Sequence, residues 1–63
     1  MSDFKTRLIA ERDDLKDRYE KLKTFIATPD FKSIDELQQI LLEQQCLQMA
    51  TLLLTLEQRL AAL

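Results

Sequence analysis

Sixty-three residues with a net charge of −2 describe one small domain, residues 1–63. Such a chain buries only about 60% of the surface that it exposes when unfolded, so it usually needs a disulfide, a metal or a partner chain. One cysteine and no histidine exclude an internal disulfide, a zinc site of the usual ligand set and histidine-dependent catalysis. We therefore expect no cofactor, no metal and no enzymatic activity, and oligomerisation remains as the source of stability.

Helix-forming residues dominate the composition. Glycine is absent and proline occurs once, so almost nothing interrupts a helix. The acidic balance argues against DNA or RNA as a partner. The first residues lack the apolar segment of a signal peptide, and the uncharged run Gln44–Leu56 is too short and too polar to span a bilayer. We expect an all-α protein of the cytoplasm, without a membrane partner.

The first helix is predicted over about residues 3–27. It ends there because Pro29 disfavours helical backbone at Thr28 and cannot donate a backbone hydrogen bond. The following residues, 28–33, are expected to form a plain turn, and a separate functional loop is the alternative.

The second helix is predicted over about residues 34–62. Ser33 and Glu36 have the spacing of a capping box, in which each side chain bonds the backbone amide of the other residue. The short connection favours an antiparallel helical hairpin. Phe31 is expected to close the end of this hairpin, with stacking on a ligand as the alternative.

One narrow apolar stripe marks the first helix. At about 100° per residue, its members fall within about 60° of one another: Phe4, Leu8, Leu15, Tyr19, Leu22 and Ile26. A stripe this narrow covers only one neighbouring helix.

The second helix carries two apolar faces. The first is a seam with alternating spacings of four and three, made of Leu42, Cys46, Met49, Leu53, Leu56, Leu60 and Leu63. The second repeats every seven residues about 100° away and contains Ile40, Leu47, Leu54 and Ala61. One partner helix cannot cover both faces. We therefore predict a homo-oligomeric helical bundle in which both sets supply candidate interface residues, with the second helices at the centre.

Cysteine and glutamine side chains on this helix have two interpretations each. Cys46 is expected to be a small buried apolar residue, and an inter-chain disulfide on oxidation is the alternative. The glutamines either fix the register between chains through buried amide pairs or are exposed helix-forming residues. They are Gln39, Gln44, Gln45 and Gln48.

Basic residues gather on the first helix beside its apolar stripe. Four of them project within about 40° of each other: Lys5, Arg12, Lys16 and Lys23. Such a row can hold an anion, while Tyr19 stacks on a base or ribose and Arg18 adds a second guanidinium. These six residues are the candidate ligand-binding site. The alternative is that the long side chains lie along the core edge with their charges in water.

Glu11 and Arg18 lie at the margin of the same stripe. They are interpreted as a polar pair between chains or as residues that line a pocket, and an ion pair of Arg18 with Asp14 is the structural alternative. The acidic residues of this helix are expected to face water, because carboxylates on a helix surface do not converge on a metal: Asp13, Asp14, Asp17 and Glu20.

Several segments resemble a known family. The run Phe4–Leu15 matches an F-x-x-R-L/V-x-x-E-x-x-E/D-L start, and Tyr19–Ile26 resembles an EKL-x-x-FI segment. The segments Phe31–Ser33 and Leu41–Met49 resemble its F-x-S/K and LL-x-x-Q-x-x-x-M features. The chain is similar to the short helical-hairpin proteins of phages and prophages that were first catalogued from crAss-like phages. A tyrosine that many members have near Thr51 is missing.

This resemblance implies a phage-encoded accessory protein in the host cytoplasm. By analogy with phage counter-defence sponges, it implies sequestration of a nucleotide immune signal, such as a cyclic nucleotide or a cyclic ADP-ribose isomer, in pockets of a homo-oligomer. The alternative function is a protein-binding helical module that inhibits or adapts a host or phage protein without a small-molecule ligand. A purely structural coiled coil is a third interpretation.

Overall fold

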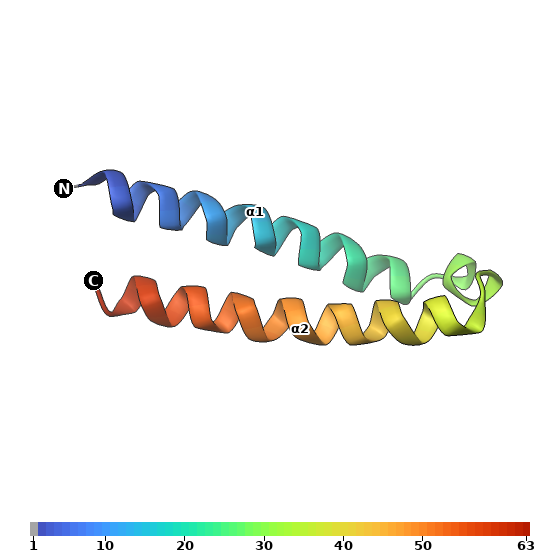
Figure 1. The fold of residues 1–63 in the computed structure, drawn as a ribbon. Helices are drawn as coiled ribbons and strands as arrows, with labels where there is room; N and C mark the ends of the chain where they lie inside the picture. Colours follow the sequence, from blue (N-terminus) through green and yellow to red (C-terminus); the bar gives the residue numbers. More distant parts are fainter. Residues whose placement is uncertain (1) are drawn as a thin grey trace.

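The computed structural model describes residues 2–63 and is a helical hairpin. Helix α1 spans Ser2–Ile26, a short 3-10 helix η1 spans Pro29–Ser33, and helix α2 spans Glu36–Ala61. The two long helices run antiparallel, and the two ends of the chain lie together at the end opposite η1 (Figure 1). The predicted all-α hairpin is confirmed.

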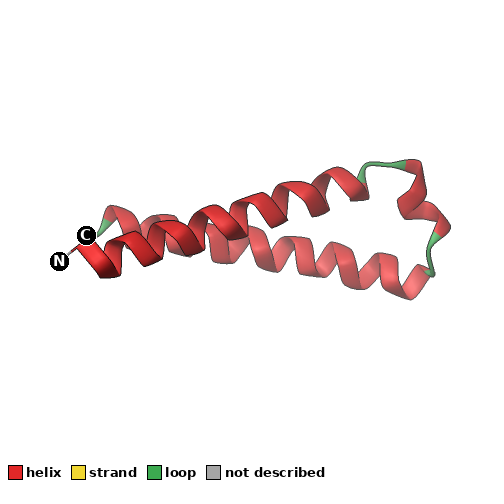
Figure 2. Cartoon of the chain, turned by 90° about the horizontal axis from the view of Figure 1, so that it is seen from above, coloured by secondary structure: helices red, strands yellow, loops and turns green. Residues whose placement is uncertain are grey.

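The molecule is a rod of 48 × 14 × 13 Å. Two perpendicular views show that the helices cross at a shallow angle and do not run strictly parallel (Figures 1 and 2). Each helix has only one neighbour, so only three apolar residues in the described part of the chain are buried, Leu8, Phe31 and Leu56. The single chain therefore has a small core.

The end of α1 follows from the residues around Pro29. The Thr28 backbone amide and hydroxyl both donate to the carbonyl oxygen of Phe25, at 3.0 and 2.6 Å. These two bonds satisfy a carbonyl that the helix leaves without a partner at its C-terminal end. Pro29 then begins η1, where its fixed φ angle is favourable and its missing amide costs nothing.

The start of α2 differs from the prediction. The helix begins at Glu36 with Asp35 at the N-cap position, and no side chain caps it. The Ser33 hydroxyl donates to the carbonyl oxygen of Asp30 at 2.7 Å, so the predicted capping box with Glu36 was wrong. The residues expected to form a plain turn, 28–33, contain η1. A 3-10 turn satisfies the Ser33 hydroxyl locally, which removes it from the N-terminus of α2.

Gln39 ties this connection to α2. Its side-chain amide donates to the carbonyl oxygens of Ile34 at 2.9 Å and Lys32 at 3.3 Å. Lys32 lies at the end of η1 and Ile34 lies between η1 and α2, so their carbonyls need partners from outside the regular helices. The Gln39 side-chain amide therefore makes its hydrogen bonds within its own chain.

Phe31 anchors η1 to the hairpin. It is 4% exposed, and its ring meets that of Phe25 edge-on, with centroids 5.9 Å apart and an interplanar angle of 88°. Such T-shaped pairs are a favoured aromatic geometry. The expectation that Phe31 closes the end of the hairpin is confirmed.

The seam of α2 packs on α1 within the chain. Leu56 is 1% exposed, and the remaining members of the inner seam are half-buried: Leu42, Cys46, Met49, Leu53 and Leu60. The sequence analysis had assigned these six residues to a surface between chains, whereas α1 of the same chain occupies this side of α2. The seam ends before Leu63, which is 61% exposed.

Leu56→Ala is expected to lower the free energy of unfolding by about 2–5 kcal/mol, because it leaves a cavity at the most buried position. Urea denaturation followed by circular dichroism, at one fixed protein concentration, measures this change. Leu63→Ala makes the same substitution at an exposed position and should stay within about 0.5 kcal/mol of the original chain. Equal losses for the two variants would contradict the packing of α2 on α1.

Candidate functional site

Basic side chains of α1 form one edge of the hairpin, here called the cation row, which consists of Lys5, Arg12, Lys16 and Lys23. The three lysines are exposed and Arg12 is half-buried. The Lys23 ammonium lies 5.7 Å from the centroid of the Tyr19 ring, within the range of a cation–π contact. The structure thus brings two of the predicted ligand residues, Tyr19 and Lys23, into direct contact.

Arg12 connects the cation row to α2. Its Nε donates to Oδ1 of Asp13 at 2.6 Å, and its Nη1 lies 3.5 Å from Oε2 of Glu57. The Arg12 side chain is 28% exposed, so part of it still reaches solvent. Two carboxylates compensate its charge, and an incoming anion has to compete with them.

Arg18 lies away from the cation row and pairs with Asp14, one turn earlier on α1. The hydrogen bond and the charge of Asp14 both raise the pKa of the Arg18 guanidinium above its ordinary value. The structural alternative for Arg18, an ion pair with Asp14, is therefore the arrangement observed.

The acidic residues of α1 serve mainly as partners of nearby cations. Lys21 pairs with Asp17 at 3.0 Å in the same i, i+4 geometry. Within residues 2–63, no three Asp, Glu or Cys side chains gather as they would around a metal ion.

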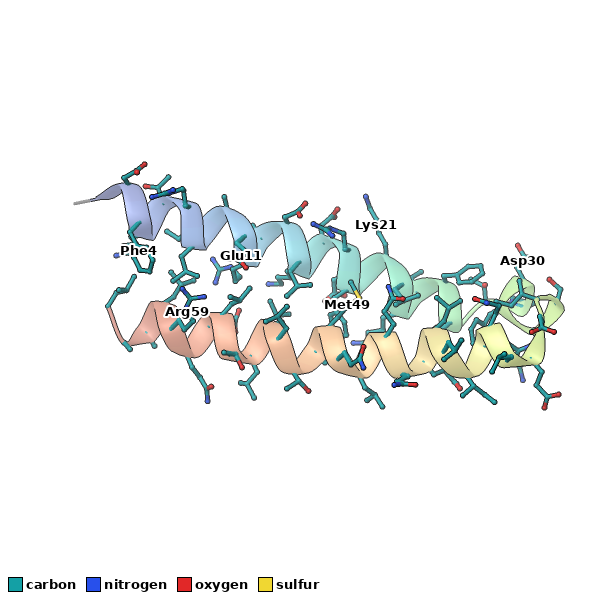
Figure 3. The ribbon with its side chains drawn as sticks, viewed as in Figure 1. Phe4, Glu11, Lys21, Asp30, Met49 and Arg59 are labelled. Atoms are coloured by element: carbon teal, nitrogen blue, oxygen red, sulfur yellow. The ribbon has the colours of Figure 1, made fainter. Side chains whose placement is uncertain are left out.

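A hollow of about 260 Å³ opens between the helices at the end where the termini lie. This open-end hollow is lined by Phe4, Arg7, Leu8, Glu11 and Arg59. Figure 3 shows Phe4 and Glu11 pointing from α1 toward α2, and Arg59 pointing from α2 toward α1. Glu11, which was interpreted as a pocket-lining residue, lines this hollow, whereas Arg18 does not.

Of the residues that line the hollow, sequence reasoning identified only Glu11 as a pocket residue. Phe4 and Leu8 were assigned only to the apolar stripe, and Arg7 and Arg59 were given no role. Arg59 lies near the opposite end of the sequence, and only the register of the antiparallel hairpin brings its guanidinium carbon to 6.0 Å from the Phe4 ring centroid. Aligning the apolar repeats of the two helices in antiparallel order, starting from the turn, could have placed Arg59 opposite Phe4.

The side of α2 that faces away from α1 is uncharged over most of its length. Its large apolar side chains are 44–71% exposed, and they define the outer face of α2: Leu37, Ile40, Leu41, Leu47, Leu52 and Leu54. Ile40, Leu47 and Leu54 were predicted interface residues, and within the single chain they have no helix against them. A shallow groove of about 460 Å³ on this face is lined by Gln44, Leu47, Gln48, Thr51, Leu52 and Thr55.

Two threonines of this groove are already bonded within α2. The Thr51 hydroxyl donates to the Leu47 carbonyl oxygen at 3.1 Å, and the Thr55 hydroxyl donates to the Thr51 carbonyl oxygen at 3.2 Å. Their oxygens keep acceptor capacity, since a hydroxyl has two lone pairs. The groove therefore offers neutral amides and hydroxyls between rows of leucine.

Two further expectations can be compared with the structure. Cys46 is a free, half-buried thiol on the inner seam, as suits a small apolar residue. None of the helices in residues 2–63 is both long enough and apolar enough to cross a membrane.

The described residues thus form a helical hairpin with an exposed apolar face on α2 and an open hollow lined by charged and apolar side chains. The chain matches the family model Sequestin over residues 2–62 and belongs to the Sequestin family. The family name points to a sequestering protein and not to an enzyme, in agreement with the sponge-like family that the sequence suggested. Searches of curated proteins and of solved structures find no match.

Arg12 and Glu57 are expected to couple by about 0.2–1 kcal/mol in a double-mutant cycle, because the pair is only partly buried. Urea denaturation of Arg12→Ala, Glu57→Ala and the double variant measures this coupling. It should shrink at about 1 M salt, where charges are screened beyond about 3 Å. A coupling energy of zero at low salt would contradict the contact between Arg12 and Glu57. A small coupling energy means that a ligand anion can replace Glu57 as the partner of Arg12.

Proposed function

We propose that the protein is a phage-encoded sequestering protein of the host cytoplasm that holds a phosphorylated nucleotide signal, of the cyclic nucleotide or cyclic ADP-ribose type, in pockets of a homo-oligomer. It counters host defence by keeping this signal from its receptor. The observation that carries the proposal is the outer face of α2, which stays exposed in the part of the chain that the structure describes.

This face requires a partner on energetic grounds. Burying a leucine or isoleucine side chain completely is worth about 1.5–3 kcal/mol, and six such side chains are exposed on one side of α2. Contiguous apolar surfaces of this kind usually mark an interaction site. A second copy supplies the same face, and a two-fold axis lets the two faces cover each other. A dimeric four-helix bundle, with α2 inside and α1 outside, is the smallest such assembly.

Polar residues at the centre of the face support a specific register. Gln44, Gln48, Thr51 and Thr55 follow spacings of four, three and four, which is the period of a helix–helix seam. When two copies meet, amides and hydroxyls of this stripe have partners across the axis, whereas a shifted register leaves some of them buried without partners.

Cations at the edge of such an assembly favour an anionic ligand. We assign the phosphate contacts to the cation row, with Tyr19 beside it. Arg18 was selected with these residues from the sequence, but it lies away from the row and is paired with Asp14, so we assign it no phosphate contact. Lys5 and Lys16 are exposed and are in no ion pair within the described residues. Sequestration is stoichiometric and needs no catalytic group, which suits the binding function that the family name indicates.

A protein-binding module is the second candidate, because the outer face of α2 also suits an amphipathic helix of another protein. The dependence of binding affinity on ionic strength distinguishes the two functions. Phosphate binding weakens steeply as salt is added, whereas docking on leucines does not.

Native mass spectrometry of protein purified gently from host cells carrying an active signalling pathway tests the proposal. We expect a closed oligomer that retains the additional mass of a nucleotide. A monomer would contradict the assembly, and an oligomer that retains no ligand under these conditions would favour the protein-binding module.

Leu47→Asp is expected to dissociate the oligomer, because a carboxylate on the outer face of α2 cannot be buried against a second copy without a large cost. Leu47 is 71% exposed in the single chain, so the substitution itself does not disturb the α1–α2 contact. Light scattering measures the mass, and Leu63→Asp is the matched control at another exposed leucine. An oligomer of unchanged mass would exclude this face as the interface.

Arg12→Ala combined with Lys16→Ala is expected to weaken nucleotide binding about tenfold or more, since each charged hydrogen bond to phosphate contributes about 1.5–3 kcal/mol. Calorimetric titration of the intact oligomer gives the affinity. Lys21→Ala combined with Lys32→Ala removes the same charge from outside the cation row and should bind like the original chain. If the affinity of the first variant is unchanged, the assignment of the row is wrong.

A further inference from the structure

We infer that the open-end hollow is a nucleotide-contacting site separate from the cation row, in which Phe4 stacks on the base, Arg59 and Arg7 bind phosphate, and Glu11 accepts hydrogen bonds from hydroxyl or amino groups. This inference rests on the proposed function and adds a second set of nucleotide contacts to those assigned to the cation row.

Phe4 is the aromatic surface of the hollow. It is 53% exposed, although it belongs to the stripe that α1 directs toward α2. Aromatic side chains are the usual platform for a base, because every base has a π-face. The Arg59 guanidinium lies over this ring, so a base stacks on the part of the ring that Arg59 leaves exposed.

Arg59 brings an uncompensated positive charge to this ring. Its guanidinium carbon lies 6.0 Å from the Phe4 centroid, and no ion pair holds it within the described residues. It is also the only basic residue of α2. A guanidinium beside an aromatic platform fits a ligand that carries a phosphate next to a base, because its fork of donors matches phosphate oxygens.

Arg7 is a second guanidinium that a ligand can recruit. Its Nη2 lies 3.2 Å from Oδ2 of Asp3, with side chains that are 75% and 79% exposed. Exposed pairs of this kind contribute little to stability, so phosphate can displace Asp3 from Arg7 at low cost.

The carboxylate of Glu11 narrows the chemical class of the ligand. Glu11 lines the hollow beside Leu8, which is 3% exposed and forms the apolar floor. An ionised carboxylate only accepts hydrogen bonds and repels a simple anion. It favours a ligand with hydroxyl or amino donors near its phosphate, as in a nucleotide, over inorganic phosphate.

The size and placement of the hollow suit one part of a nucleotide. Its volume of about 260 Å³ is slightly below the range of about 300–1,000 Å³ for complete ligand pockets, so the remainder of a larger ligand extends outside it. On α1, Arg7 and Glu11 project about 100° or more away from Lys5 and Arg12. The hollow and the cation row therefore lie on opposite edges of α1, and variants can test them separately.

Titration calorimetry of the intact oligomer with ADP-ribose, cyclic di-AMP and inorganic phosphate tests the inference. Phe4→Ala and Arg59→Gln are each expected to weaken binding of the nucleotide probe about tenfold, while inorganic phosphate binds weakly to every form. Phe4→Tyr keeps an aromatic ring and should bind like the original chain. Lys32→Gln is the charge-matched control, because Lys32 is exposed in η1 at the other end of the molecule. Native mass spectrometry and circular dichroism identify variants that have lost their assembly or fold.

The outcomes separate the inference from the proposed function. Weaker binding by Phe4→Ala and Arg59→Gln, with retention by Phe4→Tyr and Lys32→Gln, supports the site. Nucleotide binding that is unchanged in both hollow variants overturns the site and leaves the proposed function standing. The absence of binding of either nucleotide by the original chain overturns both. If either hollow variant fails to assemble, Arg7→Gln and Glu11→Gln apply the same test at exposed positions.

Discussion

The packing of α2 on α1 along a single seam is the constraint on which the rest of the structure depends. Two helices contact each other along one line. Here α2 contributes the seam from Leu42 to Leu60, whose most buried member is Leu56. The remaining surface of α2 keeps its leucines without a neighbour, and the ends of the two helices leave space between them. The exposed apolar face and the open-end hollow are therefore both consequences of how little surface one hairpin encloses.

Much of the fold could be predicted because it depends on local signals. The absence of glycine, the single proline and the apolar periodicity specify two long helices and the connection between them. The predicted capping box was wrong, although Ser33 and Glu36 match its spacing, because the backbone at this point forms η1 and buries Phe31. The spacing cannot show which of two nearby partners Ser33 will bond, and its hydroxyl donates to the carbonyl oxygen of Asp30 within η1.

The candidate site was less accessible to sequence reasoning, for a related reason. The cation row could be recognised because its members share one face of one helix. The contacts of Arg12 with Glu57 and of Arg59 with Phe4 join residues that are far apart in the chain, so they depend on the register between helices. Charge spacing did offer the ion pair of Arg18 with Asp14 as an alternative, and this pair is observed. The equivalent pair of Lys21 with Asp17 has the same spacing and was not considered.

The position of the two helix ends has a practical consequence. The start of α1 and the end of α2 lie together, and η1 lies at the far end of a rod 48 Å long (Figure 1). An affinity tag or fluorescent label attached at either terminus is therefore adjacent to Phe4 and Arg59. A label at an exposed η1 residue such as Lys32 is remote from them. A short peptide linker could also join the end of one hairpin to the start of another without crossing the length of the molecule.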